Sequence, residues 1–161
     1  MRIIFLSCLL YCSYYSHAQQ PVVTSRMEFA GIKLRIMDDA RREIQKDVDA
    51  LTASPKYYEI KAERARTYFP IIERVFKEER LPQDFKYLCL QESALISDAV
   101  STSNAVGFWQ FKDFTAVEVG MRVDRTVDER KNIVASTRGA ARWSDESIGK
   151  RASRLKIYGY Q

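Results

Sequence analysis

From Asp38 onward, apolar residues recur at the three- and four-residue spacing of an α-helix, and prolines divide this pattern into segments. The residues that mark one face of the first segment are Ala40, Ile44, Val48 and Leu51. Before it, residues 27–36 alternate only in part between apolar and polar, which allows one short strand or extended segment. The fold class that we expect is therefore all-α, with a helical N-terminal extension.

Capping residues and prolines set the expected helix starts. Asp38 or the aspartate after it would cap the first helix. Ser54 and Pro55 have the favoured N-cap and N1 arrangement for a second helix, which Pro70 would kink or restart.

Three further helices and a loop follow. Pro82 would open a third helix, and the small residues of 100–107 predict a loop. Residues 108–120 resemble a helix that ends at its final glycine, and Asn132 would cap a helix over 133–143.

The N-terminus has the pattern of a secretory signal peptide over residues 1–18. A positive residue precedes the short apolar stretch 3–12, and small residues favour cleavage after Ala18. The stretch is too short for an ordinary transmembrane helix. A lipoprotein would need Cys8 or Cys12, and neither is well placed. We expect export across the inner membrane to the periplasm or cell envelope, with no transmembrane span in the mature chain.

Cleavage there would leave Cys89 as the one cysteine and would remove the single histidine. This excludes an intramolecular disulfide, a histidine-based triad and a His or multi-Cys metal site, so we expect no metal and no cofactor. The net charge of +5 is spread along a chain of mixed sign. That distribution argues against nucleic acid as a partner.

Glu92 is the residue most suggestive of chemistry. It follows Phe85 and Leu88 at helical spacing, so we expect it at the C-terminal end of a buried stripe. On its own, a helix-end glutamate is more often solvated or salt-bridged. Farther along, Gly107–Phe111 supply aromatics and an amide at an expected helix start, and such side chains suit the apolar faces and polar edges of sugar rings.

Glu92-Ser93, followed by "AVSTSNAVGFWQF" (residues 99–111), resembles the signature of the lytic murein transglycosylases. Residues 127–143 are similar to the next helix of the membrane-bound transglycosylase D type. The resemblance runs from about Phe29 to Trp143 and is strongest from Leu81.

The resemblance implies a lysozyme-like helical domain that acts on peptidoglycan glycan strands. Glu92 would protonate the β-1,4 glycosidic oxygen between N-acetylmuramic acid (MurNAc) and N-acetylglucosamine (GlcNAc). It would then take a proton from the muramyl O6 hydroxyl, leaving a 1,6-anhydro end. Burial against the preceding apolar run would keep Glu92 protonated near neutral pH.

Other matched residues would have supporting roles near the substrate. Ser93 would support the helix end and the catalytic loop, and Ser101 matches a loop serine close to the substrate. Gln110 would hydrogen-bond the sugar or its acetamido group. Phe108 and Trp109 would either form a wall of the cleft or belong to the core.

Some residues depart from the family pattern. Asn104 stands where many relatives have glycine, and Arg80 stands where a glycine helix stop is usual. Residues 144–161 do not resemble the family's continuation, so we expect an incomplete catalytic domain, truncated at the C-terminus, that is weak or inactive. The expected divisions are 1–18 (signal peptide), 19–80 (helical extension), 81–143 (partial catalytic domain) and 144–161 (atypical tail).

Three alternative functions remain open at this stage. A hydrolytic muramidase would need a second group to activate water, and Asp98 and Asp113 are the nearest candidates. A non-catalytic remnant would bind peptidoglycan without cleaving it. A plain helical scaffold would have Glu92 in a salt bridge.

Overall fold

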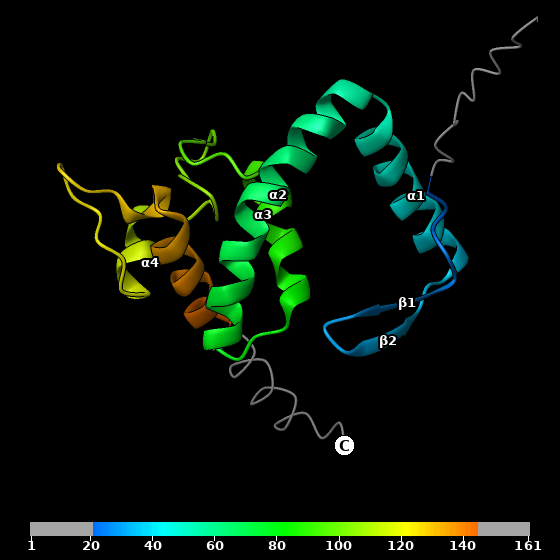
Figure 1. Cartoon of the computed structure of the whole chain (residues 1–161), viewed down its shortest axis with the longest axis horizontal. Coiled ribbons are helices and arrows are strands. Elements are labelled where there is room, and N and C mark those ends of the chain that lie inside the picture. The colour runs from blue at the N-terminus through cyan, green and yellow to red at the C-terminus, as the bar shows by residue number, and fades with distance from the viewer. Residues whose placement is uncertain (1–20, 145–161) are drawn as a thin grey trace, which may run out of the picture.

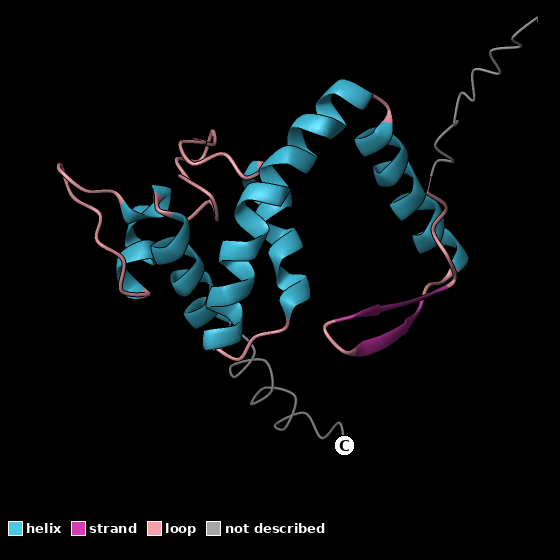
Figure 2. Cartoon of the chain, viewed as in Figure 1, coloured by secondary structure: helices cyan, strands magenta, loops and turns pink. Residues whose placement is uncertain are grey.

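The computed structural model describes residues 21–144 (Figure 1). The expected signal peptide, and the expected tail after Ser144, lie outside these residues. The described chain is mostly helical, with one β-hairpin near its N-terminus (Figure 2). None of the helices described is long and apolar enough to cross a membrane.

The hairpin means that the expected all-α class needs correction. Strands β1 (Arg26–Phe29) and β2 (Ile32–Arg35) pair in antiparallel register, with Phe29 opposite Ile32. Ala30 and Gly31 join them with φ angles of 53° and 77°. Two left-handed residues are typical of the tight turn whose twist matches that of paired strands, which explains why this partly alternating segment forms a hairpin.

The hairpin turn contacts the 3₁₀ helix η1 (Gln83–Phe85), far along the chain. The backbone N–H of Ala30 donates to Asp84 Oδ2 over 2.7 Å. The rings of Phe29 and Phe85 meet edge to face, with their centroids 5.8 Å apart. These two contacts hold the N-terminal extension against η1, which directly precedes the helix that carries Glu92.

Helix α1 (Asp38–Thr52) and helix α2 (Pro55–Glu78) diverge from their short connection and form an inverted V in Figure 1. The expected aspartate cap of α1 is wrong, because Met37 is the N-cap residue; Asp38 lies in the first turn, where its charge suits the helix dipole. Ser54 and Pro55 open α2 as expected.

Pro70 does not restart α2, which runs through it without a break. Proline removes one helical hydrogen bond. Here Pro70 and the residue four before it, Arg66, are both exposed, so water can hydrogen-bond the carbonyl that proline leaves unpaired.

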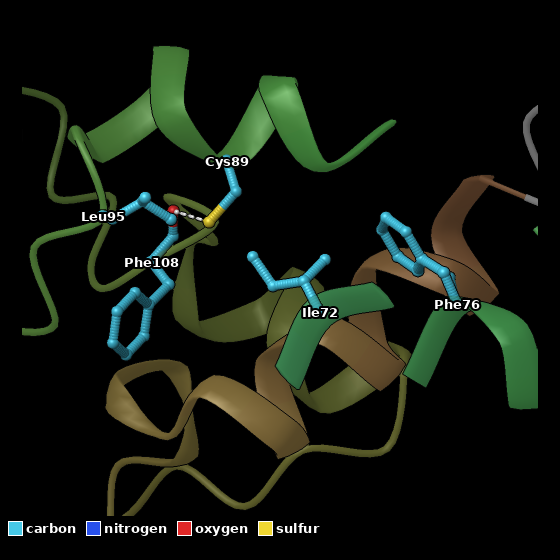
Figure 3. Close-up of a cluster of buried hydrophobic side chains, with 6 residues drawn as sticks. Ile72, Phe76, Cys89, Leu95 and Phe108 are labelled. Carbon is cyan, nitrogen blue, oxygen red and sulfur yellow. Dashed lines mark hydrogen bonds between the residues drawn. The ribbon is translucent and has the colours of Figure 1, made fainter. Parts of the chain in front are cut away.

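Two buried clusters form the core. The first comprises Ile72, Phe76, Cys89, Leu95, Phe108 and Ala141 (Figure 3). The second comprises Phe111, Ala116, Val119, Met121 and Ala140. Trp109 packs against both clusters and thereby joins them.

The stop of α2 confirms that Arg80 occupies a glycine-like position. Arg80 has a φ of 59°, and the Leu81 N–H donates back to the Phe76 carbonyl over 2.8 Å, which is the Schellman pattern of a helix end. Asn104, with a φ of 61°, is also left-handed as expected.

Helix α3 (Lys86–Ser93) carries Glu92, and α4 (Asp113–Glu118) is much shorter than the helix expected over 108–120. Gly120 does stop α4, with a φ of 82°. After the 3₁₀ helix η2 (Glu129–Lys131), the Asn132 side chain caps a helix over residues 133–144 by accepting from two backbone N–H groups.

Candidate active site

Glu92 is the penultimate residue of α3, and its side chain is exposed to solvent. The expected buried stripe is therefore wrong: Leu88 is 41% exposed, whereas Cys89 and Ser93 are buried. Leu88 and Glu92 are four residues apart, and so are Cys89 and Ser93. The spacing alone therefore could not show which of these two faces of the helix is buried. Ser93 tolerates burial because its hydroxyl has a hydrogen-bond partner.

That partner is the carbonyl of Phe108, in the loop that leads to Gln110. Ser93 Oγ donates to it over 2.8 Å, and the Cys89 thiol donates to the same oxygen over 3.2 Å (Figure 3). Burial raises the pKa of the Cys89 thiol, with a smaller contribution from the Glu92 carboxylate, so Cys89 stays a protonated donor. The end of α3 is thus tied to the loop.

The backbone after Glu92 turns left-handed twice, at Ala94 (φ 51°) and Leu95 (φ 60°). This conformation costs a non-glycine residue about 1–2 kcal/mol. Leu95 is only 1% exposed, and its burial in the first cluster helps to hold the bend. The structure therefore fixes the point at which α3 ends, just after Glu92.

Gln110 lies in a tight turn with a φ of 50°, and not at a helix start as expected. Its Nε2 donates to the carbonyls of Ala99 and Gly107, over 3.2 and 2.9 Å. Since two carbonyls accept from it, this end of the side chain must be the NH₂ group. Within residues 21–144, Oε1 accepts no hydrogen bond and remains available as an acceptor.

Glu92, Trp109 and Gln110 line one groove of about 330 Å³, formed by α3, the loop before α4, α4 and the 133–144 helix. The other lining residues are Leu88, Phe111, Lys112, Thr115, Ala140, Trp143 and Ser144. Glu92 is the only carboxylate among the described residues of this lining. It also forms no ion pair within residues 21–144, which weighs against the salt-bridged scaffold.

Trp109 fits both roles that its sequence context left open. Its ring lines the groove and packs on the core, and its Nε1–H donates to Thr137 Oγ1 over 3.0 Å. Phe108 is only 2% exposed and stacks edge to face on Tyr68, so it belongs to the core and forms no wall of the groove.

The remaining expected residues lie outside the groove lining. Ser101 Oγ accepts from the Ala105 N–H over 3.0 Å and so stabilises the loop that bears Asn104. Asp113 accepts from the next backbone N–H at the start of α4, and Asp98 is exposed in the loop after α3. Neither aspartate lines the groove with Glu92.

Sequence reasoning missed a buried ion pair that supports the groove loop. Arg130 is 8% exposed, and its Nε and Nη2 donate to the two Asp128 carboxylate oxygens, each over 2.8 Å. This pairing lowers the pKa of Asp128 and raises that of Arg130. Arg130 Nη1 also donates to the Phe111 carbonyl over 3.3 Å.

The backbone of Arg130 also touches the loop at Gly107. A Cβ atom at Gly107 would lie 2.0 Å from the Arg130 carbonyl oxygen. Within a segment as charged as residues 124–131, no sequence signal separates this buried pair from solvated neighbours.

The chain was also compared with known proteins. The family model described as "Transglycosylase SLT domain" matches residues 69–157, more than half of the chain. The chain belongs to the transglycosylase SLT domain family. The match contains the whole groove and the loop below it. It also crosses the expected division at 80/81 and continues into the segment 144–161.

Two curated proteins are similar to the chain. They are the membrane-bound lytic murein transglycosylase D of Escherichia coli strain K12 and that of strain CFT073, each 29% identical over 112 residues. These residues are 70% of the chain but 25% of each relative, so the chain spans about a quarter of the length of the curated relatives it matches. No solved structure gives a significant match.

Proposed function

We propose that the chain is a peptidoglycan lytic transglycosylase with a lysozyme-like fold that acts in the cell envelope. The family match continues to residue 157, so we propose that this chain is itself active, in place of the weak or inactive domain expected from residues 144–161. It would cleave the β-1,4 bond between MurNAc and GlcNAc and leave a 1,6-anhydroMurNAc end. The observation that carries the proposal is the groove in which Glu92, the only carboxylate among its described lining, lies with Gln110 and two tryptophans.

A single carboxylate is sufficient for this reaction. Glu92 donates its proton to the glycosidic oxygen as the bond from that oxygen to C1 of MurNAc breaks. The O6 hydroxyl of the same sugar then bonds to C1, and its proton returns to Glu92. The acetamido group of the substrate assists at C1, no water is consumed, and the carboxylic acid is regenerated.

A glycan in the groove would provide the burial that Glu92 lacks in the free protein. The apolar faces of the sugar rings would pack on Trp109 and Trp143 and displace water from the carboxyl group. Gln110 would accept a hydrogen bond at Oε1 from a sugar hydroxyl or an acetamido N–H, because its NH₂ group is already used. Ser93 would act indirectly, through its bond to the loop.

The test incubates the full chain, Glu92→Gln and the control Glu118→Gln with purified sacculi. Glu118 is exposed on α4 outside the groove lining, so its variant should match the wild type. Glu92→Gln keeps the size of the side chain but cannot transfer a proton, so release of muropeptides should fall by at least about 10²-fold.

Chromatography and mass spectrometry of the products separate the alternatives. Anhydro ends support the proposal, whereas reducing ends would indicate a muramidase. Sedimentation with sacculi, without any release of muropeptides, would indicate a binding remnant. Activity of Glu92→Gln within tenfold of the wild type would show that another group is the acid.

A further inference from the structure

Helix α3 is only eight residues long, and Glu92 lies in its last turn. The carbonyl groups at a helix C-terminus have no partner within the helix, and short helices depend on contacts from outside. If the last turn of α3 unfolds locally, the Glu92 carboxylate is no longer held at its position in the groove. The contacts that hold the end of α3 therefore bear directly on Glu92.

Arg64, on α2, makes one of these contacts. Its Nη1 donates to the carbonyl oxygen of Ala94, the C-cap residue of α3, over 3.3 Å. Arg64 is half-buried, and within residues 21–144 no carboxylate lies within ion-pair distance of it. A guanidinium at this position also suits the negative end of the α3 dipole.

The bend at Ala94 needs such support because its backbone is strained. Ala94 and Leu95 are both left-handed without being glycine. The Ala94 N–H donates to the Leu90 carbonyl over 2.9 Å, and the Ile96 N–H donates to the Ser93 carbonyl over 3.1 Å. These bonds satisfy backbone N–H groups, whereas the donor to the Ala94 carbonyl among residues 21–144 is Arg64. Strained backbone persists only where surrounding contacts over-determine it.

We infer that Arg64 is a positioning residue for Glu92, and this inference rests on the proposed function. Arg64 is outside the groove lining, so it acts from behind the bend and need not touch the substrate. It also precedes residue 69, where the family match begins. The first half of α2 would thus contribute to catalysis through one hydrogen bond.

The test compares Arg64→Met, which keeps the apolar stem but removes the charge and the donors, with Arg64→Lys, which keeps a charged donor. Arg66→Met is the matched control, because Arg66 lies on the same helix and pairs only with the exposed Glu59 and Glu63 among the described residues. Soluble glycan strands serve as substrate. A displaced reacting group costs up to about 10²-fold in rate, so we expect kcat of Arg64→Met to fall about tenfold with KM nearly unchanged.

The conservative variant should recover most of this loss, and the Arg66 control should show none. Hydrogen exchange gives a second readout that does not depend on activity: the Ala94 and Ile96 amides should exchange faster in Arg64→Met and at the wild-type rate in Arg66→Met. If these amides exchange at the wild-type rate in Arg64→Met, or if its kcat equals that of the wild type, the inference is overturned while the proposed function stands. An inactive wild type would overturn the proposed function, and with it the role of Arg64 in catalysis.

Discussion

Ser93 and Phe108 are joined by a hydrogen bond of 2.8 Å from the Ser93 hydroxyl to the Phe108 carbonyl. Through this bond the helix that bears Glu92 and the loop that bears Gln110 hold each other in place. Glu92 and Gln110 of the proposed site are thus held relative to each other by contacts in the core beneath the groove.

Removing this bond should lower the stability of the protein. Ser93→Ala leaves a buried carbonyl with the weaker thiol donor of Cys89, so we expect the free energy of unfolding to fall by about 1–2 kcal/mol. Urea denaturation measures the loss. Ser97→Ala is the control, since the Ser97 side chain forms no hydrogen bond within residues 21–144. A Ser93→Ala protein as stable as this control would contradict the prediction.

Arg80→Gly should stabilise the protein. Arg80 terminates α2 in the left-handed region, where only glycine avoids the steric cost of a Cβ atom. The gain is partly offset by the greater freedom of glycine in the unfolded chain, so we expect the free energy of unfolding to rise by about 0.5–1 kcal/mol. Thermal denaturation should show a higher Tm, and an unchanged or lower Tm would indicate that Arg80 makes a compensating contact.

Gly107→Ala should be severely destabilising, whereas Gly31→Ala should not. Both glycines have positive φ, at 82° and 77°, so both variants incur a backbone cost of about 1 kcal/mol. At Gly107 the new methyl group would also collide with the Arg130 carbonyl, while nothing lies within 4 Å of it at Gly31. We expect Gly107→Ala to lower the free energy of unfolding by about 3 kcal/mol or more in total. Equal urea midpoints for the two variants would refute this difference.

The pair of Asp128 and Arg130 should make stability depend on pH in the acid range. Hydrogen bonds from Arg130 hold the pKa of Asp128 below its usual range, so folding favours the charged carboxylate. This contribution is complete above the unfolded pKa of about 4 and is lost as pH falls through the lower folded value.

Asp128→Asn should therefore be less stable than the wild type at pH 7 by about 1–3 kcal/mol, and the gap should narrow below about pH 4. Urea denaturation across pH 2–7 would measure it. The control is Asp47→Asn, at an exposed position of α1, for which we expect almost no gap at any pH. A gap for Asp128→Asn that stays constant down to pH 2 would contradict the assignment.

The sequence predicted the features that have a local chemical signature. Asn132 caps its helix, Gly120 stops α4, and Arg80 and Asn104 adopt the left-handed backbone expected of the glycines they replace. Each of these depends on a few neighbouring residues, so a single chain is enough to recognise it.

Features that depend on distant contacts were beyond such reasoning. The buried face of α3 is set by distant residues: Cys89 packs in the first cluster, and both Cys89 and Ser93 donate to the Phe108 carbonyl. Ala94 and Leu95 are left-handed without a glycine to signal it, because tertiary contacts over-determine the bend. The aromatic run that contains Gln110 predicts a helix start. Instead, the Gln110 side chain donates to the Gly107 carbonyl and stabilises a turn.

The two tryptophans of the chain, Trp109 and Trp143, both line the groove. All of the protein's indole fluorescence therefore originates beside Glu92. A sugar that covers these rings would exchange water for an apolar ring face and shift the emission, without any label. The same signal would register glycan binding in the Glu92→Gln protein, where no bond is cut, and would separate occupancy of the groove from turnover.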